Sequence, residues 1–231
     1  MKSYLEIDDI QRLESAATNL RDRLLIRILF HLGCRVSEAI AISVDDIDLK
    51  EGTVTIQHLK TRIRTLCPHC SASLGRSHSF CPGCGHKIAQ TVKKEQERRR
   101  VRTLPLDSIT LGMLREYIER AGPVSKNGKQ MIFGHNRHRA FQIIRKCAEE
   151  TGLGDLVNPT TGKKCGVSPH RLRDAFAVHA MKLNDSGDGM RLLQVHLGHA
   201  NFNTTARYRK VAGEEHREWY SKLWDNGEAS G

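Results

Sequence analysis

Two different spacings of apolar residues run through the first hundred positions. Residues 20–33 read LRDRLLIRILFHLG, with an apolar residue every three or four positions. This spacing predicts an amphipathic helix that ends at Gly33. Residues 51–59 instead alternate β-branched and polar residues after a glycine, and residues 99–107 offer a partner, which together predict an antiparallel hairpin.

Helical spacing dominates the rest of the chain. Further helices are expected at 7–18, 35–42, 108–122, 137–152, 169–183, 186–197 and 213–224. The polar, glycine-containing stretches 121–130 and 158–169 predict loops. The expected fold class is therefore α+β, mainly α-helical with a small antiparallel β-sheet.

About forty residues separate the two predicted strands, far more than a hairpin loop needs. This insert, residues 61–98, carries CPHC at 67–70 and CPGC at 81–84. A CxxC pair forms a tight turn that aims two thiolates at one ion. The sequence therefore predicts a zinc ribbon with the ligands Cys67, Cys70, Cys81 and Cys84.

We expect this zinc to be structural, because four thiolates leave no position open for a reacting water. Tetrahedral all-sulfur geometry also suits iron, which is the minor alternative. Cys34, Cys147 and Cys165 lie outside the pairs and are expected to be ordinary free thiols. The N-terminal residues contain no apolar signal core, so that a reducing, cytoplasmic setting is expected.

The charge balance indicates the class of partner. Lys and Arg number 37 against 26 Asp and Glu, a net charge of +11. Such an excess favours a polyanion, most often nucleic acid, although a merely soluble basic protein is the alternative. No run approaches the roughly 18 apolar residues of a membrane span, so no membrane partner is expected.

Six scattered side chains together suit chemistry at a phosphodiester. They are two arginines, a lysine, two histidines and a tyrosine: Arg35, Lys60, His170, Arg173, His199 and Tyr208. Two guanidiniums can clamp the non-bridging oxygens, a phenol can attack phosphorus, and an ammonium can protonate the leaving oxygen. A phenol has a pKa near 10, so nearby cations or an imidazole must help it ionise. Neither paired carboxylates nor a Gly-rich phosphate loop is present, so no catalytic metal is expected.

Three segments resemble the tyrosine recombinase (phage-type integrase) family. They are DRLLIRILFHLGCRVSEAIAISVDDID, SPHRLRDAFAVH and LLQVHLGHANFNTTARYRKV, which are similar to the first arginine box, the HxxR box, and the leucine-glycine-histidine box with its tyrosine. The likeness covers residues 5–212 apart from the insert. It implies a tyrosine recombinase catalytic domain over residues 1–231, with the zinc ribbon inside its β-hairpin.

The resemblance also implies a role for each residue. Arg35 and Arg173 would clamp the phosphate, and Lys60 would protonate the leaving 5′ oxygen, with Lys93 and Lys94 as rivals. His170 would accept the proton of the nucleophile Tyr208. His199 would hydrogen-bond the scissile phosphate. Among the neighbours of these residues, His196 would be support, Glu38 would orient the first box, and Asp174, at a position where the family often has histidine, would pair with a basic group.

On this basis the expected function is site-specific cleavage and rejoining of double-stranded DNA through a 3′-phosphotyrosyl intermediate, without ATP or a catalytic metal. A homotetramer on DNA is implied, with a monomer possible in its absence. The C-terminal helix, with Trp219, Leu223 and Trp224, would dock on a neighbour or pack on its own domain. Family members usually carry an N-terminal core-binding domain, and none is expected here because the chain begins almost at the catalytic domain.

Two alternatives share this fold: a catalytically silent DNA-binding regulator or structural protein, and a type IB topoisomerase-like relaxing activity. The insert itself is expected either to grip DNA or to contact protein. The grip would use basic side chains in or near the insert, namely Arg62, Arg64, Lys87, Lys93, Arg98, Arg99 and Arg100.

Overall fold

The computed structural model describes residues 2–75, 77–158 and 161–208, apart from the side chains of residues 58–64 and 93–100. The chain forms two compact units. Unit 1 combines the residues up to Ile56 with those from Arg102 onward, and unit 2 comprises Gln57–Val101. The predicted C-terminal helix at 213–224 lies outside the described residues.

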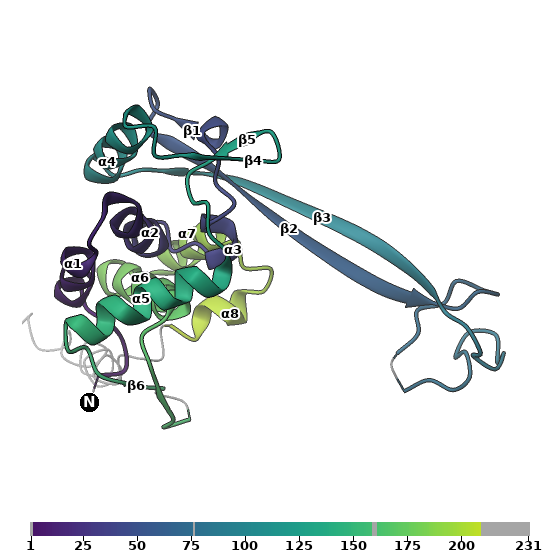
Figure 1. The fold of residues 1–231 in the computed structure, drawn as a ribbon. Helices are drawn as coiled ribbons and strands as arrows, with labels where there is room; N and C mark the ends of the chain where they lie inside the picture. The colour runs from purple at the N-terminus through teal and green to yellow at the C-terminus, as the bar shows by residue number, and fades with distance from the viewer. Residues whose placement is uncertain (1, 76, 159–160, 209–231) are drawn as a thin grey trace, which may run out of the picture. The chain divides into compact units, whose positions relative to one another are not determined.

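Helices make up most of unit 1, and the labels below are those of Figure 1. The helices are α1 Ile7–Ala16, α2 Leu20–His31, α3 Val36–Ala39, η1 Val44–Asp46, α4 Ser108–Glu119, α5 Arg137–Glu150, α6 Pro169–Leu183, α7 Gly187–Leu197 and α8 Phe202–Ala206. The strands are β1 Ile47–Asp48, β2 Thr53–Leu66, β3 Val92–Pro105, β4 Val124–Lys126, β5 Lys129–Met131, β6 Leu156–Val157 and β7 Lys164–Cys165. Strands β2 and β3 each begin in one unit and end in the other.

Helix α2 is the centre of unit 1. It packs against α1, α4 and α6. Its apolar residues are buried on several faces, including Leu24, Leu25 and Leu29, each at 0% exposure. A helix that is apolar nearly all round is stable only when other elements surround it, so α2 takes the central position.

One buried cation fixes α2 against its neighbours. Arg27 is 8% exposed and lies among polar groups from α1 and the start of α4. Its guanidinium donates to Glu14 Oε2 at 2.9 Å and to Asp107 Oδ1 at 2.8 Å, and its Nε donates to Thr110 Oγ1 at 2.8 Å. A buried arginine is tolerated when its donors are satisfied in this way, and the network sets the relative register of three helices.

The main sheet is small and has the order β1-β2-β3. Strand β1 pairs antiparallel with β2 in the register Ile47↔Val54 and Asp48↔Thr53. Strands β2 and β3 run further than the sequence predicted, to Leu66 and from Val92, because the charged residues that looked like a loop continue the extended backbone. The predicted α+β class, mainly helical with a small antiparallel sheet, is confirmed.

Several elements were missed at the level of sequence. The predicted loop 121–130 holds most of the hairpin β4–β5, whose turn residues Asn127 and Gly128 have φ of 51° and 74°. An Asn-Gly pair between short extended segments is a strong signal for such a turn and could have been used. The pair β6–β7 and the short helix α8 carry no comparable pattern. Within the described part of the chain, no helix has the length and apolar character needed to cross a bilayer.

Candidate active site

The first predicted arginine follows a glycine that the fold requires. Gly33 has φ +53°, and a Cβ at this position would lie 2.3 Å from Cδ1 of Phe176. The turn brings Arg35 to the N-cap of α3, where its guanidinium contacts Glu38 Oε1 at 3.0 Å and its backbone N–H donates to Glu38 Oε2. The side chain of Arg35 remains 37% exposed, so its guanidinium can still reach a ligand.

Glu38 holds a second arginine that the sequence did not single out. The Glu38 side chain is 1% exposed, and Arg102 donates to its Oε2 at 2.7 Å. Burial alone would raise the pKa of Glu38, but the hydrogen bonds from Arg102 and from the Arg35 backbone outweigh it and lower the pKa to about 2. Glu38 is therefore a fixed anion that positions Arg35, as expected.

Arg173 is the most enclosed cation of the site. It is 2% exposed and donates to two carbonyls, Gly33 O at 2.6 Å and Leu197 O at 2.9 Å. These carbonyls follow α2 and close α7, where helix ends leave acceptors without partners and carry negative partial charge. Burial and the nearby charge of Arg35 lower the pKa of Arg173 to about 10, which leaves it protonated at neutral pH.

His199 lies directly against this arginine. Its Nε2 is 3.0 Å from Arg173 Nη2, and its Nδ1 is 2.9 Å from Thr205 Oγ1. A guanidinium only donates, so Nε2 accepts and Nδ1 carries the hydrogen that Thr205 accepts. Burial and the charges of Arg173 and Arg35 lower the pKa of His199 to about 4, so the ring is neutral. In this state Nε2 has no proton to donate to a phosphate.

Tyr208 stacks beside His199 but is turned to other partners. The two rings are 6.5 Å apart at 16°. The phenol is 3% exposed and donates to Asp174 Oδ1 at 2.7 Å, while Arg207 Nη2 donates to the phenol oxygen at 2.6 Å. Burial and the charge of Asp174 raise the pKa of Tyr208 to about 12. The sequence predicted cations that ease ionisation; Arg207 acts in that direction, but burial and the carboxylate outweigh it.

The remaining predicted residues are His170, His196 and Lys60. His170 is exposed, with its Nε2 3.9 Å from Asp174 Oδ2. His196 donates to the Leu32 carbonyl at 3.1 Å and stacks on Phe176, so it supports the α2–α7 junction. Lys60 belongs to β2 in unit 2, and its side chain lies outside the described residues, as do those of Lys93 and Lys94.

Three functional neighbours were not predicted in these roles. Arg102 stands at the end of a basic run, where sequence cannot separate one buried arginine from exposed ones. In the sequence, nothing distinguishes Thr205 from other polar residues. Only the fold places its side chain next to His199. Asp174 was expected to pair with a basic group, and it does pair with Arg171 at 3.0 Å and Arg207 at 3.2 Å, but its contact with the tyrosine was not foreseen.

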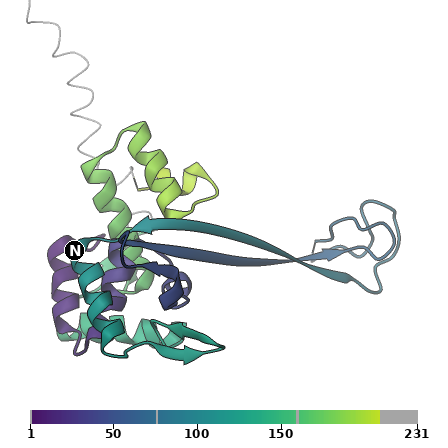
Figure 2. The same cartoon turned by 90° about the horizontal axis from the view of Figure 1, so that it is seen from above.

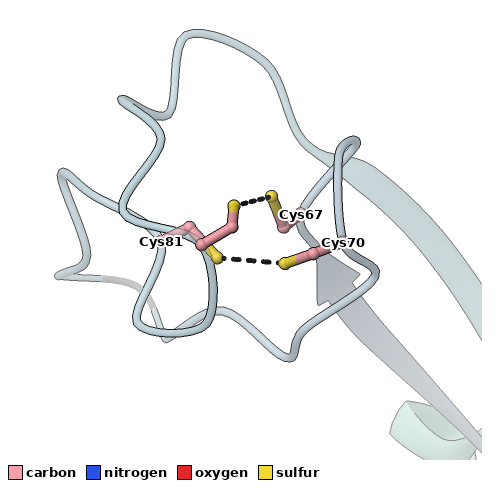
Figure 3. Close-up of side chains that lie close together, drawn as sticks. Cys67, Cys70 and Cys81 are labelled. Carbon is pink, nitrogen blue, oxygen red and sulfur yellow. Dashed lines mark hydrogen bonds between the residues drawn. The ribbon is translucent and has the colours of Figure 1, made fainter.

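The four predicted ligand cysteines gather in unit 2. The Sγ atoms of Cys67, Cys70, Cys81 and Cys84 all lie within 4.8 Å of one another. Cys67 Sγ lies 3.8 Å from Cys84 Sγ, and Cys70 Sγ lies 3.4 Å from Cys81 Sγ. Figure 3 shows the labelled side chains of Cys67, Cys70 and Cys81 close together. Four thiols this close, without disulfide bonds, are compatible with one tetrahedral metal ion such as zinc.

The two CxxC turns have the same backbone hydrogen bonds. In the first turn, Ser71 N–H donates to Cys67 O and Cys67 N–H to Ala72 O; in the second, Gly85 N–H donates to Cys81 O and Cys81 N–H to His86 O. Ser71 and Gly85, which follow the second cysteine of each pair, both have left-handed φ, 56° and 69°. This internal repetition is what a two-turn metal site requires, because each turn presents its two sulfurs in the same way.

Comparison with known proteins gives a match to one family. Residues 3–76 and 84–215 match the sequence profile of the Phage integrase family. Tyrosine recombinase XerD of Corynebacterium glutamicum is 26% identical over 222 residues, which are 93% of this chain and 56% of that protein. The chain spans about half the length of the curated relatives it matches.

Solved structures give the same fold. A crystal structure of XerA recombinase superposes with a TM-score of 0.61 at 21% identity, covering 97% of this chain and 66% of the other. The Tn1549 transposon integrase in complex with transposon right end DNA gives a TM-score of 0.62 at 13% identity, with 96% and 66% coverage. At these identities the likeness shows the fold alone.

Proposed function

This chain belongs to the phage integrase family, and on that premise we propose that it is a tyrosine-type site-specific DNA recombinase. It cleaves and rejoins double-stranded DNA through a 3′-phosphotyrosyl intermediate, without ATP or a catalytic metal. The observation that carries the proposal is the contact of buried Arg173 with His199. The charge of Arg35 acts on Arg173, and the Tyr208 ring stacks on His199.

The proposed cleavage step uses each residue once. Arg35 and Arg173 bind the non-bridging oxygens and stabilise the charge that grows on them. Tyr208 Oη forms a bond to phosphorus while the bond from phosphorus to the 5′ oxygen breaks. The phenol proton passes to His170, and Lys60 gives a proton to the leaving oxygen. The negative charge of the phosphate opposes the effects of burial and of the Arg173 and Arg35 charges on His199, so that Nε2 takes up a proton from solvent and donates a hydrogen bond to the phosphate.

A nicked suicide duplex tests the nucleophile. The short fragment released by cleavage diffuses away, so the covalent adduct accumulates and can be counted on a denaturing gel. Wild type should form the adduct, Tyr208→Phe should form none, and Tyr117→Phe, which alters a buried tyrosine bonded to Gly122 O, should still form it. An adduct from Tyr208→Phe at the wild-type level would remove the assignment.

A second function is favoured by one observation. The Tyr208 hydroxyl is buried and bonded to a carboxylate, as it would be in a DNA-binding regulator or structural protein that has lost catalysis. Wild-type protein that binds duplex DNA but forms no adduct on any nicked substrate would support this alternative. Relaxation of supercoils without recombinant product would instead indicate topoisomerase-like activity.

The general acid can be identified by changing the leaving group. A substrate with sulfur in place of the bridging 5′ oxygen releases a thiolate, which needs no proton at neutral pH. We expect Lys60→Ala to cleave ordinary DNA at least 100-fold more slowly and the sulfur substrate at nearly the wild-type rate. If Lys93→Ala or Lys94→Ala shows this rescue and Lys60→Ala does not, the general acid is on the exit strand.

We also propose that the four cysteines bind structural zinc within an inserted ribbon at 61–98, and that the catalytic domain spans residues 1–231. The expected partners are double-stranded DNA and three further copies of the chain, in the cytoplasm and associated with the nucleoid if the protein is prokaryotic or viral. Counting protomers on DNA by mass photometry tests the tetramer. Reversing the charge of Lys87, an exposed residue of unit 2, tests the DNA grip, because a lost phosphate contact should reduce the salt slope of binding by about one.

A further inference from the structure

The hydroxyl of Tyr208 both donates and accepts a hydrogen bond. It donates its hydrogen to Asp174 Oδ1 at 2.7 Å and accepts from Arg207 Nη2 at 2.6 Å. The Arg207 guanidinium also lies 4.7 Å from the centre of the tyrosine ring. Neither Arg35 nor Arg173 is among the hydrogen-bond partners of this hydroxyl in the described part of the chain. The oxygen that should attack phosphorus therefore has one lone pair hydrogen-bonded to Arg207 and its proton hydrogen-bonded to Asp174.

The carboxylate that accepts this hydrogen bond is itself firmly held. Asp174 is 3% exposed and bonds Arg171 on the same helix through its other oxygen, at 3.0 Å. The Tyr208 ring packs into an apolar cluster of α6 and α7, two helices that lie together with α8 (Figures 1 and 2). The members of this cluster are Ala177, Val178, Met181, Met190, Leu193 and Leu197. The docked phenol is thus a packed arrangement and not a loose rotamer.

We propose that Asp174, Arg207 and Tyr208 form a latch that keeps the nucleophile docked and protonated until DNA is bound, with Asp174 as its positioning residue. The proposal rests on the proposed function, since it assigns a resting state to that nucleophile. A carboxylate is a much weaker base than a phenolate, so the bond to Asp174 preserves the phenol and opposes attack. Arg207 is 50% exposed and is the part of the latch that an incoming phosphate can reach.

The surroundings of Asp174 explain why the latch holds at neutral pH. The charged or titratable groups that face it are Arg171 and His170 on α6, Arg207 and Tyr208 after α8, and Tyr4 near the N-terminus. Two of these groups, Arg171 and Arg207, are permanent cations that donate to the Asp174 carboxylate at 3.0 and 3.2 Å and so fix its position. Burial, followed by the charge of Asp174, raises the pKa of Tyr208 to about 12, in agreement with a docked phenol.

The test follows the tyrosine without any DNA. Tetranitromethane nitrates accessible and ionisable tyrosines, and mass spectrometry of the Tyr208 peptide reports its rate at pH 8. Asp174→Asn keeps the shape but removes the charge, and it should nitrate Tyr208 at least fivefold faster than wild type. The matched control Asp188→Asn removes an exposed carboxylate of α7 in the same unit and should leave this rate unchanged.

The same proteins are then compared on the suicide duplex in single turnover. We expect Asp174→Asn to form the adduct several-fold faster at saturating protein, with little change in DNA affinity. Unchanged nitration overturns the latch, and so does faster nitration with abolished cleavage, which would make Asp174 a proton acceptor. Faster nitration with no adduct from either protein supports the latch and overturns the recombinase assignment instead.

A second variant covers the case in which Asp174→Asn fails to fold. Asp174→Glu keeps a charge for both arginines but moves the carboxylate by one methylene from its 2.7 Å contact. Nitration of Tyr208 should again be faster than in wild type. A wild-type rate in folded Asp174→Glu contradicts the latch.

Discussion

The two units of this chain are stabilised in different ways. Unit 1 has a continuous apolar core that gathers residues from Leu5 to Ala175 around α2. In unit 2, among the residues whose side chains are described, the buried apolar cluster is Cys67, Leu74 and Cys81, with Ala72 and Ile88 packed against it. Two of the three buried members are candidate metal ligands. Unit 1 thus owes its stability to apolar burial, whereas the described side chains of unit 2 bury little apolar surface besides that of the two cysteines.

The two units also differ in what holds their candidate functional side chains. In unit 1 the carbonyls at two helix ends accept hydrogen bonds from Arg173, and the turn at Gly33 positions Arg35. These candidate site residues are therefore held in place by the packed core. In unit 2 the four cysteines are the candidate metal ligands, and the same unit carries Lys60, the proposed general acid. Removing a bound metal should therefore lower the stability of unit 2 alone, and removing a buried charge should lower the stability of unit 1 alone.

Removal of the metal should give the largest effect. Zinc contributes roughly 10–16 kcal/mol to the folding of small zinc-binding peptides, so a strong chelator, or Cys81→Ser, should unfold unit 2. We expect hydrogen exchange to show lost protection between residues 65 and 91 and retained protection in α2 and α6. Metal content by mass spectrometry should fall from one zinc per chain to none.

A cysteine outside the cluster is the control for this comparison. Cys165 lies in β7 of unit 1, half-buried, with its thiol against the Leu156 carbonyl at 3.4 Å. Cys165→Ser should retain full zinc content and protection in both units. If chelation also removed the protection of α2, the two units would not be independent in stability.

Replacing Glu38 should give the next largest effect, and only in unit 1. Glu38→Gln leaves Arg102, whose side chain is 11% exposed, with a neutral partner, and breaking a largely buried pair costs about 3–5 kcal/mol. Urea denaturation at pH 7 measures this loss. Glu149→Gln, which alters an exposed pair with Arg145, should change stability by less than about 1 kcal/mol.

The same variant makes a prediction about pH. The pKa of Glu38 falls from 4.5 to about 2 on folding, so its contribution is full above pH 4.5 and is lost as the pH falls from 4.5 through 2. A shift of this size corresponds to roughly 3 kcal/mol. Wild-type stability should therefore fall across this window, and Glu38→Gln should lack that part of the fall. Parallel pH profiles for the two proteins would contradict the role of Glu38.

The elements with a clear period could be predicted from the sequence. Helix α6 was expected at 169–183 and occupies Pro169–Leu183, because its apolar spacing and its cap agree. The hairpin strands were placed correctly but too short, since their charged outer parts have no alternating apolar face. The clustering of the four CxxC cysteines was predictable because their spacing encodes a local turn geometry.

The contacts within the site were less predictable than its members. Arg173 and His199 are 26 residues apart, and nothing in the spacing indicates that one donates to the other. The state of Tyr208 depends on burial and on a carboxylate 34 residues away, so its raised pKa required the fold. Residue types suggested phosphoryl transfer, and packing decided which groups are charged, neutral or docked.

A further prediction concerns a single buried hydrogen bond in unit 1. Thr205→Val removes the acceptor for His199 Nδ1–H at a fully buried position, and an unsatisfied buried donor costs about 1–3 kcal/mol. In the proposed cleavage step His199 carries a proton on both nitrogens, so this cost falls on the phosphate-bound state, and adduct formation on the suicide duplex should slow about 10- to 100-fold at pH 7, since each 1.4 kcal/mol is a factor of ten. Thr205→Ser keeps the hydroxyl and should stay within a few-fold of wild type. A wild-type rate for Thr205→Val would show that Thr205 does not set the tautomer of His199.

The smallest expected effect concerns the backbone of the two CxxC turns in unit 2. Gly85 has φ +69°, and a Cβ there would meet nothing within 4 Å, so a side chain is penalised only by its backbone conformation. Left-handed φ costs a non-glycine residue roughly 1 kcal/mol, so Gly85→Ser should weaken zinc binding about fivefold in competition with a chelating dye. Ser71→Gly relieves the same strain at the matching position of the other turn and should not weaken binding. Equal losses from both changes would mean that the two turns do not carry the metal in the same way.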